Sequence, residues 1–175
     1  NYPSYLFALY AELLYSGACK ENGVKCANID VGRYCGNFCV LSQDVSSSAD
    51  EKLDGYGLAL LAGASQKEML YDEKKQFREG FYADHLYEYA LKAKELFPEI
   101  EIDKNFLLDL YKIAFLDLMF CGEDRNPTNI MFLIHKKGDK RHLSVAPIFD
   151  NEFSFEFMRL AGLYLHFKLD PVDVY

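Results

Sequence analysis

Three polar side chains with the chemistry of a metal and phosphate site stand at the two ends of a predicted β-hairpin. Asp124 and Asn129 lie five positions apart in CGEDRNPTNIMFL, directly before the apolar run 130–134. Asp150 follows a second apolar run, in PIFDN. Because an antiparallel hairpin brings its open ends together, we expect these side chains to converge. Carboxylate and amide oxygens suit Mg²⁺, which keeps further positions for water and substrate phosphates.

This set of side chains is suited to phosphoryl transfer. Oxygen ligands hold the metal that neutralises charge on the transferred phosphate, while a separate carboxylate orients the attacking hydroxyl and accepts its proton. An Asp, four residues, an Asn, a hairpin and a second Asp follow the order of the protein-kinase catalytic loop and metal segment. The alternative is an ordinary turn, in which Asp, Asn and Pro are common. A turn does not explain why an acid recurs where the second strand ends, so we favour the functional interpretation.

The segments GEDRNPTNIMFL and LSVAPIFDNEFSF resemble the catalytic core of HipA-like kinases, a bacterial Ser/Thr kinase family with a divergent protein-kinase fold. The specific resemblance covers residues 117–155. GNFCVLSQDV is more weakly similar to the hinge-side sheet of that family. The Asp-Arg-x-x-x-Asn loop also resembles that of phosphatidylinositol kinases, so a phosphoinositide or small-molecule kinase is the alternative within the same fold.

The resemblance implies a role for each of five residues. Asp124 would be the catalytic base, and Arg125 a structural or phosphate-facing cation beside it. Asn129 and Asp150 would bind Mg²⁺. Glu12 would correspond to the helix glutamate that pairs with a nucleotide-binding lysine, the alternative being an ordinary exposed helix glutamate. The implied cofactors are ATP and Mg²⁺, and the implied substrate is a Ser or Thr hydroxyl of a protein. The substrate protein could be an antitoxin-like partner.

The chain departs from the family pattern at three places. Asn126 stands where the HipA-like pattern has His, and Glu152 stands where an Asp-Asn-Gly segment would have Gly. No Gly-rich phosphate-covering loop with a strand lysine precedes the first helix. Three alternatives follow: a kinase fragment without much of the small lobe, a kinase that binds nucleotide differently, or a kinase-like nucleotide-binding module without turnover.

Composition sets limits on the class of protein. The 175 residues are 50% hydrophobic, which is enough for one globular domain with a sizeable core. The net charge of -8 disfavours direct nucleic-acid binding, which needs a basic surface. The sequence has no run of about 20 apolar residues, so no membrane span is predicted. An odd count of five cysteines favours a reducing, cytoplasmic compartment, and Cys35 and Cys39 are expected to pack in the core.

The N-terminal part is expected to hold one helix and two short strands. Pro3 and Gly17 bracket the helix. Its expected apolar stripe comprises Leu6, Leu9, Tyr10, Leu13 and Leu14. KCANIDVG and RYCGNFCVLS predict two strands joined by a turn at VGRY. The polar, Ser-rich segment 43–57 predicts a loop, and an internal boundary would lie there.

The remainder is predicted to be mostly helical, with helices over 66–80, 82–97 and 104–120. The second half of the last helix is apolar nearly all round, which indicates a buried central helix. The hairpin follows, and its basic tip is expected to be solvated (Lys136, Lys137, Lys140, Arg141). This order is α+β. The resemblance makes it a protein-kinase-like fold, with a small-lobe remnant over 1–45 and a mostly helical large lobe with the catalytic hairpin over 46–175.

Overall fold

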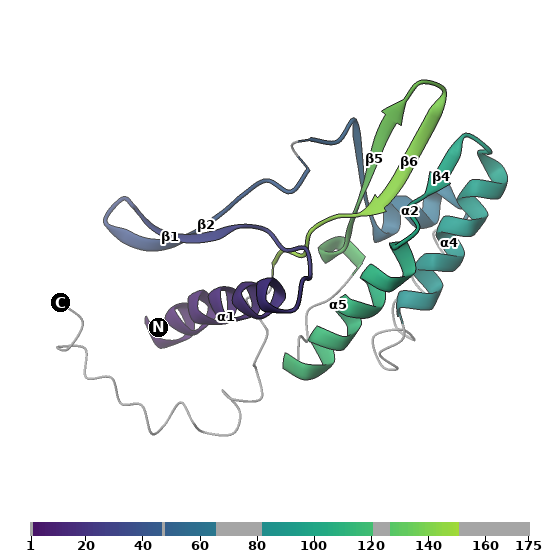
Figure 1. The fold of residues 1–175 in the computed structure, drawn as a ribbon. Helices are drawn as coiled ribbons and strands as arrows, with labels where there is room; N and C mark the ends of the chain where they lie inside the picture. The colour runs from purple at the N-terminus through teal and green to yellow at the C-terminus, as the bar shows by residue number, and fades with distance from the viewer. Residues whose placement is uncertain (1, 47, 66–81, 121–126, 151–175) are drawn as a thin grey trace.

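The computed structural model describes residues 2–46, 48–65, 82–120 and 127–150 (Figure 1). Within these ranges the chain is a mixed α+β protein, which confirms the expected fold class at this coarse level. The helices are α1 (Tyr2–Glu21), α2 (Gly55–Leu61), α4 (Tyr82–Leu96), α5 (Phe106–Phe120) and the short 3-10 helix η1 (Pro127–Asn129). The strands are β1 (Ile29–Tyr34), β2 (Asn37–Ser42), β3 (Glu51–Asp54), β4 (Ile100–Ile102), β5 (Met131–Lys137) and β6 (Lys140–Val145).

A four-stranded sheet with the strand order β3-β5-β6-β4 carries the core. Its β3, β5 and β6 pair antiparallel, and β4 runs parallel to β6. Successive side chains of a strand point to opposite faces, so Phe132 and Ile134 share one face of β5 and are fully buried. The ring of Phe106 on α5 stacks on that of Phe132 at 5.4 Å between centroids. Figure 1 shows α4 and α5 side by side next to this sheet.

The predicted hairpin is confirmed. β5 and β6 pair from Phe132 opposite Val145 to Lys137 opposite Lys140, which leaves a two-residue turn. Gly138 in that turn has a φ of 60°, a left-handed conformation that glycine adopts at no steric cost. Helix α4 also matches its predicted range closely. The helix predicted over 66–80 lies outside the described residues.

The first hairpin turns at a different place from the one predicted. VGRY belongs to β1, and the turn consists of Cys35 and Gly36, both in left-handed conformations with φ of 50° and 83°. Two such residues form the turn whose twist matches a hairpin, which explains why β1 continues to Tyr34. Cys35 is exposed and Cys39 is half-buried, and both are free thiols, so their predicted place in the core is wrong.

Helix α1 buries a different face from the one predicted. Tyr10 and Leu14, members of the expected apolar stripe, are 56% and 58% exposed. Among the side chains of α1 that the structure describes, from Tyr10 onward, the buried ones are mostly small or polar: Ala11, Glu12, Tyr15, Ser16 and Cys19. Polar members of this face bond to other segments, so the helix is positioned by specific contacts as well as by apolar area.

Two expectations about the middle of the chain are also corrected. The segment predicted as a loop contains β3 and the start of α2, where Asp54 caps the helix by accepting from the Gly57 amide at 2.7 Å. Helix α5 is not buried all round, because Phe115 and Leu118 are 60% and 77% exposed. Its buried positions are Phe106, Leu110, Ile113, Leu116 and Asp117.

Candidate functional site

The open end of the β5–β6 hairpin brings the two predicted metal-binding segments to the same part of the fold. The amide of Ala146 donates to the carbonyl of Met131 at 2.9 Å, which closes the ladder at this end. Asn129 ends η1 two residues before Met131, and Asp150 lies four residues beyond Ala146. The segments that carry Asn129 and Asp150 therefore leave the hairpin at the same end.

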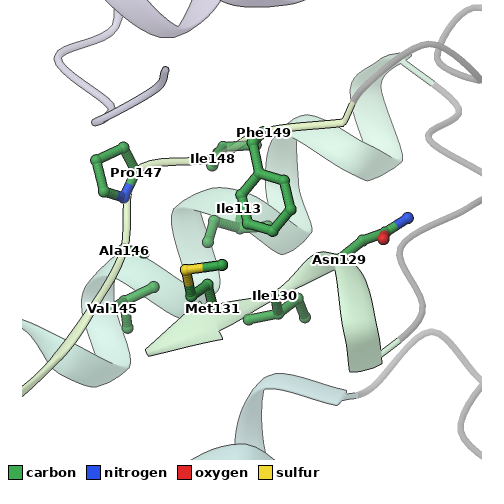
Figure 2. Close-up of a pocket in the computed structure, with 9 residues that line it drawn as sticks. All are labelled: Ile113, Asn129, Ile130, Met131, Val145, Ala146, Pro147, Ile148 and Phe149. Atoms are coloured by element: carbon green, nitrogen blue, oxygen red, sulfur yellow. The ribbon is translucent and has the colours of Figure 1, made fainter. Parts of the chain in front are cut away.

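A small pocket lies between the two arms of this open end (Figure 2). Asn129 and Phe149 line it from the two arms, and Ile113 of α5 lines it from the central helix. Most of the lining is apolar, and the carboxamide of Asn129 points away from it (Figure 2). The arms of the hairpin therefore rest on α5, while the polar group of Asn129 faces outward.

Asp150 has an unusual backbone conformation. Its φ of 57° lies in the left-handed region, and its side chain is exposed. Asp and Asn enter this region more readily than other residues with a Cβ, because their short side chains can hydrogen-bond locally. Uncommon backbone conformations cluster at functional sites, so an acid held in one at the hairpin's end is a candidate ligand.

The predicted base and its neighbouring cation lie outside the described residues. This holds for Asp124 and Arg125, and equally for Asn126 and Glu152, where the sequence departs from the family pattern. The described chain resumes at Pro127 in η1, so Asn129 is the part of the predicted catalytic loop that the structure describes.

Glu12 is buried on the inner face of α1, with only 7% of its surface exposed. It lies one helical turn before Tyr15 and Ser16, which are buried on the same face. The alternative of an ordinary exposed helix glutamate is therefore wrong. An acid is almost never buried without compensating partners, so Glu12 serves a structural or functional purpose inside the fold.

Tyr15 joins α1 to the C-terminal part of α5. Its hydroxyl donates to the Asp117 carboxylate at 2.8 Å in a buried contact. Its ring meets that of Phe120 edge to face, with centroids 5.7 Å apart. Both partners lie in the last turns of α5, directly before the segment that contains the predicted base. The sequence analysis did not single out Asp117. The signal was its position within the apolar run LDLMF, since an acid that is buried there needs a hydrogen-bond donor.

A second connection joins the end of α1 to the arm that carries Asp150. The amide of Ile148 donates to the carbonyl of Lys25 at 2.9 Å, and the amide of Ala27 donates to the carbonyl of Ile148 at 2.7 Å. These bonds form a parallel bridge between Cys26 and Ile148. The segment after α1 is thus paired with the segment directly before Asp150, while α1 itself is bonded to α5 through Tyr15.

The basic hairpin tip is largely ion-paired. Lys136 and Arg141 both contact Glu51 on β3, at 2.8 and 2.6 Å, and Lys140 lies 3.3 Å from Glu101 on β4. Hydrogen bonding to Lys136, with a further contribution from Arg141, lowers the pKa of the Glu51 carboxyl. These cations are occupied by neighbouring strands, so the tip contributes to sheet pairing rather than to an open phosphate patch.

The donor set at the hairpin's open end fits Mg²⁺ by its chemistry. An amide oxygen from Asn129 and a carboxylate from Asp150 are hard oxygen ligands, and Mg²⁺ commonly takes one or two of these with water and phosphate. No group of three His, Cys, Asp or Glu side chains within the described ranges could hold a metal ion. Within these ranges a Mg²⁺ ion would therefore be held by Asn129 and Asp150 together with water and substrate oxygens.

None of the helices described in the structure is long and apolar enough to cross a membrane. Comparisons of the chain with protein-family models, with curated proteins and with solved structures give no match.

Proposed function

We propose that this chain is an ATP- and Mg²⁺-dependent phosphotransferase of the HipA-like type, acting on a Ser or Thr hydroxyl of a protein. The observation that carries the proposal is the shared open end of the β5–β6 hairpin, where the segments bearing Asn129 and Asp150 lie against α5. A hairpin that separates an amide ligand from an acidic ligand is the arrangement used in kinase-type phosphoryl transfer.

In this proposal each residue has a distinct task. Asp124 orients the substrate hydroxyl and accepts its proton, and Arg125 stabilises negative charge beside it. Asn129 and Asp150 would hold the Mg²⁺, which when bound neutralises charge on the phosphates. Glu12, buried on α1, would orient a cation that contacts the nucleotide.

Two contacts support a common site for these residues. The Tyr15–Asp117 hydrogen bond holds α1 against the last turns of α5, from which the chain continues toward Asp124. The bridge between Cys26 and Ile148 holds the segment that follows α1 against the arm that leads to Asp150. The proposed base, ligands and helix glutamate are therefore attached to segments that contact one another.

The surrounding properties agree with a protein substrate. A net charge of -8 disfavours direct nucleic-acid binding, which needs a basic surface. Lys136, Lys140 and Arg141 of the hairpin tip are paired with Glu51 or Glu101, which leaves them poorly suited to an anionic lipid surface. A bacterial cytoplasmic protein, such as an antitoxin-like partner, is the proposed source of the hydroxyl.

Phosphate transfer tests the proposal directly. The chain is incubated with γ-labelled ATP, Mg²⁺ and a mixture of Ser- and Thr-containing peptides, and labelled peptide is quantified. We expect transfer by the wild type, and loss of transfer with Asp124→Asn, because the amide cannot accept the proton. ATP binding without transfer by the wild type would indicate a kinase-like binding module without turnover. Undiminished transfer by Asp124→Asn would remove its assignment as the base.

A further inference from the structure

The first residue of α2 lies against the backbone of η1 with no room for a side chain. A Cβ added to Gly55 would lie 2.9 Å from both the Cβ and the carbonyl oxygen of Pro127, and 3.1 Å from its Cα. Gly55 is also buried. Non-bonded carbon atoms prefer separations of about 3.5–4.0 Å, so these distances leave space for a hydrogen atom only.

Space, and not backbone conformation, is what requires glycine at this position. The glycines with positive φ among the described residues are Gly23, Gly36, Gly63 and Gly138, and Gly55 is not one of them. Any residue could adopt the backbone conformation of Gly55. The contact with Pro127 is therefore the feature that a larger residue would disturb.

The residues on both sides of this contact are attached to the sheet and to α2. Asp54, directly before Gly55, pairs with Met131 in the β3–β5 ladder and caps α2 through the Gly57 amide. Pro127 begins η1, which leads through Asn129 to the first residue of β5. The turn is thus held at one end by the sheet and at the other by the N-terminus of α2.

We propose that Gly55 is a positioning residue for Asn129. The absence of a side chain lets α2 rest directly on the backbone of Pro127, and this contact sets the place of η1 and of the Asn129 carboxamide. The inference rests on the proposed function, in which Asn129 is a Mg²⁺ ligand. Gly55 itself contacts neither metal nor nucleotide in this account and acts through the turn.

A methyl group at Gly55 would shift η1 by about 0.5–1 Å to restore normal contact distances. Mg²⁺ demands ligand distances close to ideal, and a misplacement of about 1 Å in a site can cost about 100-fold in rate. We therefore expect Gly55→Ala to weaken Mg²⁺-dependent ATP binding at least about tenfold. Binding of ATP without Mg²⁺ should remain unchanged, because it does not use Asn129 as a metal ligand.

Calorimetric titration with ATP, with and without Mg²⁺, tests this inference on the wild type, Gly55→Ala and Gly17→Ala. Gly17 is the matched control, since it lies on an exposed position of α1 with nothing within 4 Å of an added Cβ. We expect Mg²⁺ to raise the affinity for ATP in the wild type and in Gly17→Ala. In Gly55→Ala this gain should be lost. The same gain in wild type and Gly55→Ala would overturn the role of Gly55 and leave the proposed function standing. No Mg²⁺-dependent binding by the wild type would overturn both.

A second variant keeps the test decisive if Gly55→Ala does not fold, as judged by its thermal unfolding. Pro127→Gly removes the Cβ that lies nearest to Gly55 and loosens η1 without adding an atom. We expect it to lower the Mg²⁺-dependent gain in affinity in the same direction as Gly55→Ala. A gain equal to that of the wild type would contradict the inference.

Discussion

The hydroxyl of Tyr15 donates a buried hydrogen bond of 2.8 Å to the carboxylate of Asp117, a residue 102 positions away in the chain. The bond joins the first helix to the last turns of α5. Because the buried carboxylate needs donors, this bond fixes which face of α1 points inward. Glu12 lies on that same buried face, so the bond also determines where Glu12 is held.

The variant Tyr15→Phe should lower the free energy of unfolding by about 1–3 kcal/mol, because it removes a donor from a buried carboxylate while keeping the ring. The ring contact with Phe120 should survive, so the fold should be retained. Urea denaturation followed by circular dichroism measures the difference.

Tyr10→Phe is the matched control for this prediction. Tyr10 lies on the same helix with 56% of its surface exposed, so the same chemical change should alter stability by less than about 0.5 kcal/mol. Equal effects of the two substitutions would contradict the importance of the Tyr15–Asp117 hydrogen bond.

Glu12→Gln tests whether the buried glutamate serves nucleotide binding. The substitution keeps the size of the side chain and removes its charge. We expect the Kd for ATP with Mg²⁺ to rise about tenfold or more, which corresponds to about 1.4 kcal/mol. Glu21→Gln, at the exposed end of α1, should bind as the wild type does. A loss of stability in Glu12→Gln with unchanged affinity would instead assign Glu12 a purely structural role.

The ion pairs of Glu51 predict a dependence of stability on pH. Lys136 and Arg141 lower the pKa of Glu51 in the folded protein relative to the unfolded chain. Its contribution to stability is therefore fully present above the unfolded pKa of about 4.3, and is lost as the pH falls through the lower folded pKa.

Denaturation of wild type and Glu51→Gln between pH 7 and pH 3 measures this contribution. The stability difference between the two proteins should be constant near neutral pH and should shrink in the acid range. Glu95→Gln, at an exposed position of α4, controls for the loss of a surface charge. A difference between wild type and Glu51→Gln that does not change with pH would contradict the role of the ion pairs.

The sequence predicted the elements whose structure depends mainly on residues close together in the chain. The β5–β6 hairpin was predicted because two strand-like runs flank a basic turn that contains glycine, and the two-residue turn with Gly138 at positive φ agrees with that reason. Helix α4 was predicted from its apolar spacing. Asn129 and Asp150 were predicted to meet because antiparallel pairing alone brings the ends of a hairpin together.

The elements that depend on distant partners were not predicted. β3 has only four residues, and its strand conformation comes from pairing with β5, about 80 positions later. The inner face of α1 was missed because Glu12 and Ser16 look like surface residues until the partners of that face are known. The contact of Gly55 with Pro127 depends on the tertiary fold in the same way.

The most direct test of the proposed site is the affinity of the wild type and Asp150→Ala for ATP, each measured by calorimetry with and without Mg²⁺. The account predicts tighter binding by the wild type when Mg²⁺ is present. It predicts that Asp150→Ala loses most of this gain and keeps its affinity for ATP alone, because Asp150 acts through the metal. An equal loss of affinity with and without Mg²⁺ would show that Asp150 is a structural residue, and would contradict the proposed metal site.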